Sequence, residues 1–109
     1  MQAPLEVRFH NLLPSPMVET AIRDNFREIE QLAPELVSCR VTIDSPHRHH
    51  EQNKLFAVTI DLRFACGAVV VSRRPVQGAN EDAYVAVRDA FDAARRQLMS
   101  ARSSAPRVV

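Results

Sequence analysis

Glycine is scarce in this chain, with two residues in 109. Phosphate-binding loops of the GxGxxG and GxxxxGKS/T types need several glycines, because their backbone must approach the phosphate closely. Neither pattern occurs in the sequence. The common nucleotide-binding loops are therefore excluded, and we predict no cofactor and no small-molecule substrate.

Cysteine is also rare, and Cys39 and Cys66 stand alone in strand-like runs. No CxxC pair occurs, so a zinc ribbon is excluded and a disulfide scaffold is disfavoured. We expect both to be core or near-core thiols in a reducing cytosol.

The longest apolar run, residues 65–71, is too short for a membrane helix. Residues 1–11 lack the apolar stretch of a signal peptide, so we expect a cytoplasmic protein without a membrane partner.

A catalytic constellation is missing as well. The serines occur outside any nucleophile-elbow sequence, and most acidic residues fall on predicted exposed helix faces. No nucleophile, base and orienting group can be named together, so we predict that the protein is not an enzyme.

Excess positive charge is absent. The net charge is +1 and the pI about 7.9, whereas nucleic-acid-binding domains tend toward a pI above about 9. Any nucleic-acid role must therefore rest on a local basic face. The length of 109 residues and the 46% hydrophobic content fit one soluble domain.

Alternating apolar and polar residues predict four strands. They cover residues 5–10, 37–44, 56–64 and 68–74, and the last two form a hairpin through a turn at residues 66–67. In the second strand, Val37, Cys39, Val41 and Ile43 form the apolar side.

Two segments have the spacing of amphipathic helices. Ser15 is a predicted N-cap with Pro16 at the first helical position, and Pro34 ends this first helix. Its apolar stripe comprises Val18, Ile22, Phe26, Ile29 and Ala33 or Leu32. The second helix is predicted from a cap at Asn80, with Glu81 and Asp82 in its first turn, to about residue 101. Its apolar stripe comprises Tyr84, Val87, Phe91, Ala94 and Leu98.

These elements predict a single α+β domain with β-α-β-β-β-α order. Both helices cover one face of a four-stranded, mostly antiparallel sheet, and the other face meets solvent. The first two strands are expected to be parallel because a helix connects them. The domain spans residues 1–102, with a short flexible tail at 103–109.

The string His47-Arg48-His49-His50 is unusual. Alternate imidazoles of an extended loop can chelate a metal, but nothing else in the chain has ligand spacing toward them. A polar loop is the favoured interpretation, so we predict no metal site and keep His47, His49 and His50 as weak candidates. A third interpretation is phosphate contact, which protonation of the imidazoles would strengthen.

Arginines recur along the last predicted helix. Arg88, Arg95 and Arg102 are seven residues apart, with Arg96 adjacent, so they line one side. This side is either a ridge that follows phosphates or an exposed face of ion pairs, such as Asp92 with Arg96 or Arg88. Spacing alone favours the ion-paired face.

The same helix carries a family motif in Asp82, Tyr84, Ala86, Val87, Arg96, Gln97 and Leu98. It resembles the last helix of the ribosome hibernation promoting factor and ribosome-associated inhibitor family, also called the sigma-54 modulation family, in its short form. Ser15-Pro16, the histidine loop and the strand with Val69-Val70-Val71 are also similar. The resemblance covers about residues 4–101.

The resemblance implies a fold like that of double-stranded RNA-binding domains. It also implies a translation inhibitor that binds ribosomal RNA (rRNA) in the decoding channel of the small ribosomal subunit under stress, as a monomer or weak dimer. Family members contact phosphates with basic side chains of both helices and their neighbours. The implied RNA-binding residues are Arg23, Arg73, Arg74, Arg88, Arg95 and Arg96, with additional phosphate contacts from Arg27, Arg48 and Arg102.

The chain departs from its relatives at several basic positions. Asn25, Glu28, Ala93 and Ser100 stand where relatives often carry lysine. Each missing phosphate contact lowers the salt dependence of binding by about one unit. An alternative function is therefore a stress-regulatory protein-interaction domain with weak or no ribosome binding.

Overall fold

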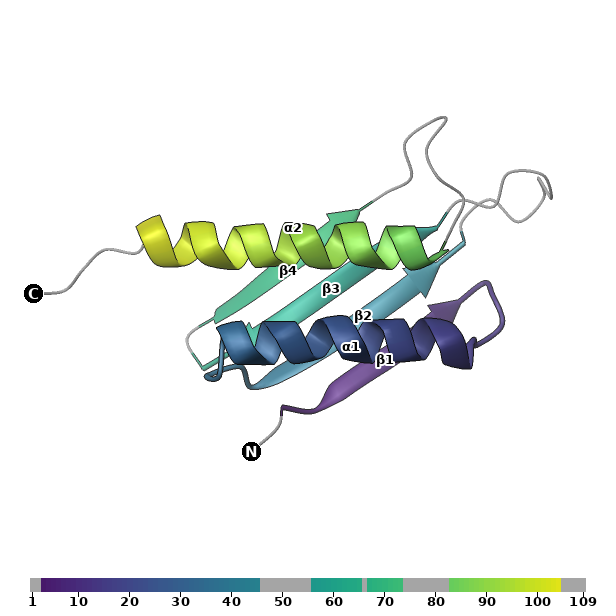
Figure 1. Cartoon of the computed structure of the whole chain (residues 1–109), viewed down its shortest axis with the longest axis horizontal. Coiled ribbons are helices and arrows are strands. Elements are labelled where there is room, and N and C mark those ends of the chain that lie inside the picture. Colours follow the sequence, from purple (N-terminus) through teal and green to yellow (C-terminus); the bar gives the residue numbers. More distant parts are fainter. Residues whose placement is uncertain (1–2, 46–55, 66, 74–82, 105–109) are drawn as a thin grey trace, which may run out of the picture.

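The computed structural model describes residues 3–45, 56–65, 67–73 and 83–104. The elements follow one another in the predicted β-α-β-β-β-α order (Figure 1). Their bounds are β1 (Leu5–His10), α1 (Pro16–Leu32), β2 (Ser38–Asp44), β3 (Ala57–Phe64), β4 (Gly67–Arg73) and α2 (Ala83–Ser104).

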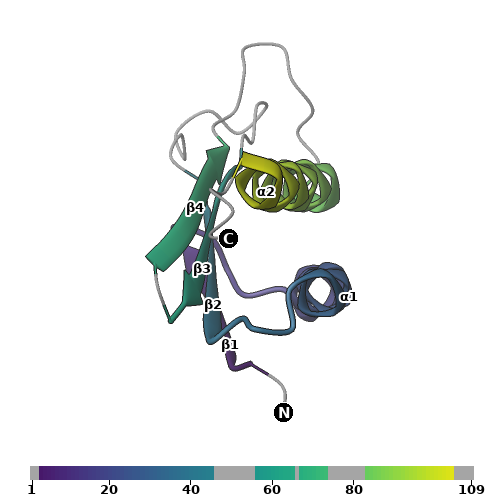
Figure 2. The same cartoon turned by 90° about the vertical axis from the view of Figure 1, so that its left-hand side faces the viewer.

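The four strands lie side by side in chain order. β1 runs parallel to β2, and the other two neighbouring pairs are antiparallel. One row across the sheet joins Val7, Val41, Ile60 and Val71. Figure 2 shows both helices on one face of the sheet, with no described element on the other. These findings confirm the predicted fold class and the parallel first pair.

The start of α1 follows from its sequence. The Ser15 hydroxyl accepts a hydrogen bond from the Val18 N–H at 3.3 Å, and Pro16 occupies the first turn. This cap satisfies one of the backbone donors that the first helical turn leaves unpaired. The helix ends at Leu32, just before Pro34, as predicted.

The core lies between the helices and the sheet. α1 contributes Val18, Ile22, Phe26 and Ile29, and α2 contributes Val87, Ala90, Phe91, Ala94 and Leu98. Alternate residues of β2 and β3, together with Ala33, Leu36 and Val71 of β4, complete it. Phe91 is the largest fully buried side chain among the described residues. Among the described helices, none combines the length and apolarity needed to cross a membrane.

Some details differ from the prediction. Val37 precedes β2 and is 52% exposed, whereas its neighbour Leu36 is buried in the core. The Val37 N–H donates to the carbonyl of Arg63 in β3 at 2.8 Å. Tyr84 is 40% exposed, so the buried stripe of α2 starts one turn later, at Val87. Gly67, predicted in a turn, is the first residue of β4.

The end of α2 also differs, because the helix continues to Ser104 rather than to about residue 101. Residues 103 and 104, assigned to the tail, are therefore helical. The predicted cap and first-turn acids at 80–82, the rest of the tail at 105–109, and Cys66 lie outside the described residues.

Candidate nucleic-acid interface

The exposed side of α2 presents two accessible arginines. The side chain of Arg88 is mostly exposed, and its nearest acidic partner is Asp89 at 3.8 Å. Arg96 is exposed and forms no ion pair with any described residue. Arg96 is therefore accessible to an external anion without breaking an ion pair among the described residues, and Arg88 would give up only one long contact.

Arg95, adjacent to Arg96, is placed differently. Its guanidinium donates to Glu28 of α1 at 3.1 Å and to Asp92 of α2, and its side chain is 28% exposed. The predicted pairing of Asp92 with Arg88 or Arg96 was wrong in detail, since Asp92 pairs with Arg95. Arg95 thus joins the two helices, and a phosphate would have to compete with two carboxylates for it.

Arg23 and Arg27 lie on the side of α1 that faces β1. Together with Leu5 and Phe26 they line a small hollow of about 170 Å³. Arg23 pairs with Glu19 at 2.9 Å, and Arg27 lies 3.9 Å from Asp24. The side of α1 that faces α2 carries Glu28 instead. The structure therefore does not bring Arg23 into one patch with the arginines of α2.

The structure does not describe the side chains of several residues implied to bind RNA. Arg73 is the last residue of β4 and Arg102 lies in α2, but the structure describes neither side chain. Arg74, Arg48 and the three histidines of the loop lie outside the described residues. Within the described part of the chain, no three metal-ligating side chains come together.

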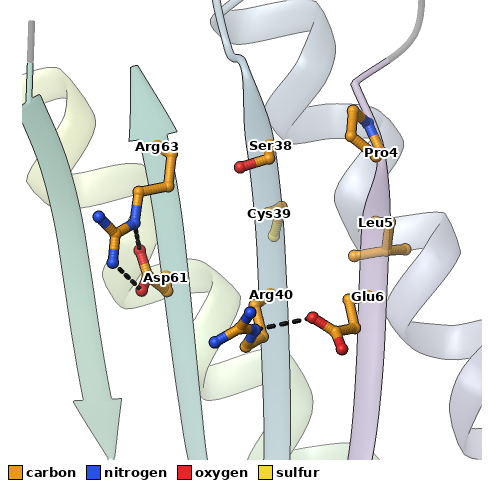
Figure 3. Close-up of a pocket in the computed structure, with 8 residues that line it drawn as sticks. All are labelled: Pro4, Leu5, Glu6, Ser38, Cys39, Arg40, Asp61 and Arg63. Carbon is orange, nitrogen blue, oxygen red and sulfur yellow. Dashed lines mark hydrogen bonds and ion pairs between the residues drawn. The ribbon is translucent and has the colours of Figure 1, made fainter. Parts of the chain in front are cut away.

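The open face of the sheet carries charges that the sequence reasoning did not single out. Glu6 accepts from Arg8 at 2.9 Å and from Arg40 at 2.8 Å, and Arg63 donates twice to Asp61 at 3.0 and 3.1 Å. Glu6, Arg40, Asp61 and Arg63 line a depression of about 460 Å³ (Figure 3). The hydrogen bonds from Arg8 and then Arg40 lower the pKa of Glu6. Alternation places these residues on the open face, and a spacing of two allows Glu6 to pair with Arg8 and Asp61 with Arg63. Only the strand register shows that Glu6 also meets Arg40.

Cys39 is buried on the opposite face of β2. Burial, followed by the charges of Asp61 and Glu30, raises the pKa of its thiol to about 12. The protonated thiol is a poor nucleophile, so Cys39 is a core residue, as predicted.

A family model described as sigma 54 modulation protein / S30EA ribosomal protein matches residues 5–104. The chain belongs to this family. The match confirms the resemblance found in the last helix. The S30EA domain therefore accounts for nearly all of the chain, and every described strand and helix falls within it.

Two solved structures share the fold of this S30EA domain. A ribosomal subunit interface protein from Coxiella burnetii superposes with a TM-score of 0.74 at 10% identity, over 93% of this chain and 99% of that chain. The N-terminal domain of Protein Y from Thermus thermophilus gives 0.65 at 15% identity, over 88% and 94%. No curated protein matches the chain in sequence. At these identities the likeness concerns the fold alone.

Proposed function

We propose that this S30EA-family protein associates with the small ribosomal subunit and silences translation by binding rRNA in the decoding channel. The family match over residues 5–104 carries this proposal, because the family is described as ribosomal. One structure with the same fold is a ribosomal subunit interface protein. The proposed action is occupation of a site in the cytoplasm, and it needs no catalysis, cofactor or membrane.

Arg88 and Arg96 are the proposed principal contacts. Both are exposed on α2, and neither is held by an ion pair shorter than 3.8 Å within the described residues. Structured RNA is recognised mainly through its phosphates and shape, so accessible guanidinium groups matter more than base-reading side chains. Arg23 and Arg27 are proposed to reach phosphates from the other side of α1. Arg73, Arg74, Arg48 and Arg102 remain proposed contacts.

Co-sedimentation with vacant small subunits at several salt concentrations tests the proposal. The native protein is expected to pellet with the subunits at low salt and to dissociate as salt rises. Removing two phosphate contacts with R88A/R96A is expected to reduce the slope of log K against log salt by about two. The matched control is R40A/R63A, which removes the same charge from the open sheet face and is expected to leave the slope unchanged. Absence of binding at low salt would overturn the proposal.

A second candidate is a stress-regulatory protein-interaction domain with weak ribosome binding. The pairing of basic residues favours it, because Glu19, Glu28 and Asp92 neutralise arginines implied to contact RNA. Under this alternative, the R88A/R96A and R40A/R63A variants would sediment alike. Capture of the same protein partner by both variants would then support the interaction role.

A further inference from the structure

The outer edge of β1 has main-chain groups without a described partner. β1 is the end strand of the sheet and pairs only with β2. The carbonyls of Pro4 and His10 accept from the Cys39 and Ser45 N–H groups of the β2 side at 3.0 and 3.2 Å. Successive residues of a strand direct their main-chain groups to opposite sides. The main-chain groups of the even residues from 4 to 10 therefore bond to β2. Those of Leu5, Val7 and Phe9 point away from β2, toward the free edge of the sheet.

The sequence of this edge is complementary to itself when reversed. If a second copy pairs antiparallel with the two Val7 residues opposite each other, Leu5 faces Phe9 of the second copy. All these residues direct their N–H and C=O groups outward, so each such pair can exchange two hydrogen bonds. The same register places Glu6 opposite Arg8 of the second copy. Backbone geometry and charge thus favour one register.

The charged pairs fall where cross-strand side chains come closest. Glu6 and Arg8 are both on the open face, with half-exposed side chains. In an antiparallel pair, opposed residues that share no main-chain hydrogen bonds have Cα atoms about 4.5 Å apart. Opposite charges in such positions attract, and like charges repel. The two-fold axis produces this Glu–Arg pair twice.

The helix face of the same edge has room for the partner. The hollow of about 170 Å³ beside β1 has Leu5 and Phe26 among its lining residues, with Arg23 and Arg27 from α1. Leu5 and Phe9 are only half-buried in the single chain. In the proposed register, the Phe9 side chain of the second copy lies beside Leu5, next to this hollow. The ring would cover apolar surface that the monomer leaves exposed.

We propose that two copies of this protein form a two-fold dimer by antiparallel pairing of their β1 strands about Val7. The two sheets then become one continuous sheet. A two-fold interface requires a self-complementary patch, and β1 supplies it in both charge and shape. The opposite edge lacks this selectivity, because β4 has no charged residue between Gly67 and Ser72. This dimer goes beyond the proposed ribosome association and does not depend on it.

Charge exchange at the interface gives a direct test. Sedimentation equilibrium of the native protein should show a mass that rises with concentration from 12.3 kDa toward twice that value. E6R and R8E are each expected to remain monomeric, because every cross-strand pair then joins like charges. An equimolar mixture of E6R and R8E should form a heterodimer, and the double variant E6R/R8E should dimerise with itself. Arg63→Glu, with the same charge change away from the edge, should dimerise normally.

Thermal melting of each variant confirms that it is folded, and hydrogen exchange locates the contact. The outward amides of Leu5, Val7 and Phe9 should exchange more slowly as the protein concentration rises, whereas those of Glu6 and Arg8 should not change. A native protein that stays monomeric to millimolar concentration would overturn the proposal. So would folded E6R and R8E variants that dimerise like the native protein.

Discussion

Arg95 and Arg96, adjacent in α2, are expected to have different roles, Arg95 in the stability of the fold and Arg96 in ribosome binding. Arg95 bridges α1 and α2 through Glu28 and Asp92, whereas Arg96 is exposed and forms no ion pair with the described residues. Arg95→Ala should therefore lower the free energy of unfolding, with little change in the salt slope of ribosome binding. Arg96→Ala should do the opposite. Each variant is the matched control of the other, because the charge change is the same.

The size of the Arg95 effect follows from its exposure. The side chains of Glu28 and Asp92 are 63% and 42% exposed, so solvent screens both ion pairs. Exposed pairs contribute about 0.2–1 kcal/mol each, and the half-buried stem of Arg95 adds packing. We expect a total loss of about 1 kcal/mol for Arg95→Ala, close to the effect of a typical destabilising substitution. In a domain of this size, this loss corresponds to a fall in Tm of about 5 °C.

Urea unfolding of both variants measures the difference. A double-mutant cycle with Arg95→Ala and Glu28→Gln isolates the bridge between the helices, with an expected coupling of about 0.5 kcal/mol. Co-sedimentation with small subunits measures the salt slope in parallel. The reasoning would be refuted if Arg95→Ala left stability unchanged and reduced the salt slope by about one. Arg95 would then be an RNA contact that exchanges its carboxylate partners for phosphate.

Three further predictions concern the stability of the fold. The unfolding free energy of the native protein should fall relative to that of Cys39→Val between about pH 9 and 12, by up to about 1.4 kcal/mol per pH unit. The thiol of the unfolded chain ionises in this range, while burial keeps the pKa of the folded thiol at about 12. If urea unfolding gave the same difference in unfolding free energy between the two proteins at every pH, the prediction would be wrong. Phe91→Ala should lose about 3–5 kcal/mol in the same assay, because the ring is fully buried. A loss below about 1 kcal/mol would mean that the site is loosely packed. Ser15→Ala should lose about 1 kcal/mol by removing the cap of α1, whereas Ser15→Asp should retain it.

The order of elements was predictable because its signals are local. Period-two alternation predicted β1 and β3, and the Ser15-Pro16 cap predicted the start of α1. Errors arose where a tertiary contact replaced the local pattern. Val37 continues the alternation of β2, yet it precedes the strand and is exposed, and Leu36 packs into the core instead. Tyr84 fits the spacing of the apolar stripe but is substantially exposed at the start of α2.

The candidate site was predictable in residue type but not in arrangement. Seven-residue spacing grouped Arg88 with Arg95, whereas the packing of α2 on α1 couples Arg95 to Glu28 and leaves Arg88 exposed. Sequence spacing also could not show that Arg23 faces β1, away from the arginines of α2. Such groupings depend on which sides of two helices meet, and periodicity within one helix contains no information about the other.

The sequence by itself determined the strands, the helices, the family motif of α2 and the buried stripes, because periodicity and caps act within a few residues. It also contains the reversed complementarity of residues 5–9, which any antiparallel pairing of this segment would inherit. Tertiary structure decided that β1 is an end strand in which the main-chain N–H and C=O groups of Leu5, Val7 and Phe9 point to the free edge. It also decided which arginines are neutralised. The physical reason is that ion pairs and free edges depend on distances between segments far apart in the chain, and these distances are set only when the helices pack on the sheet.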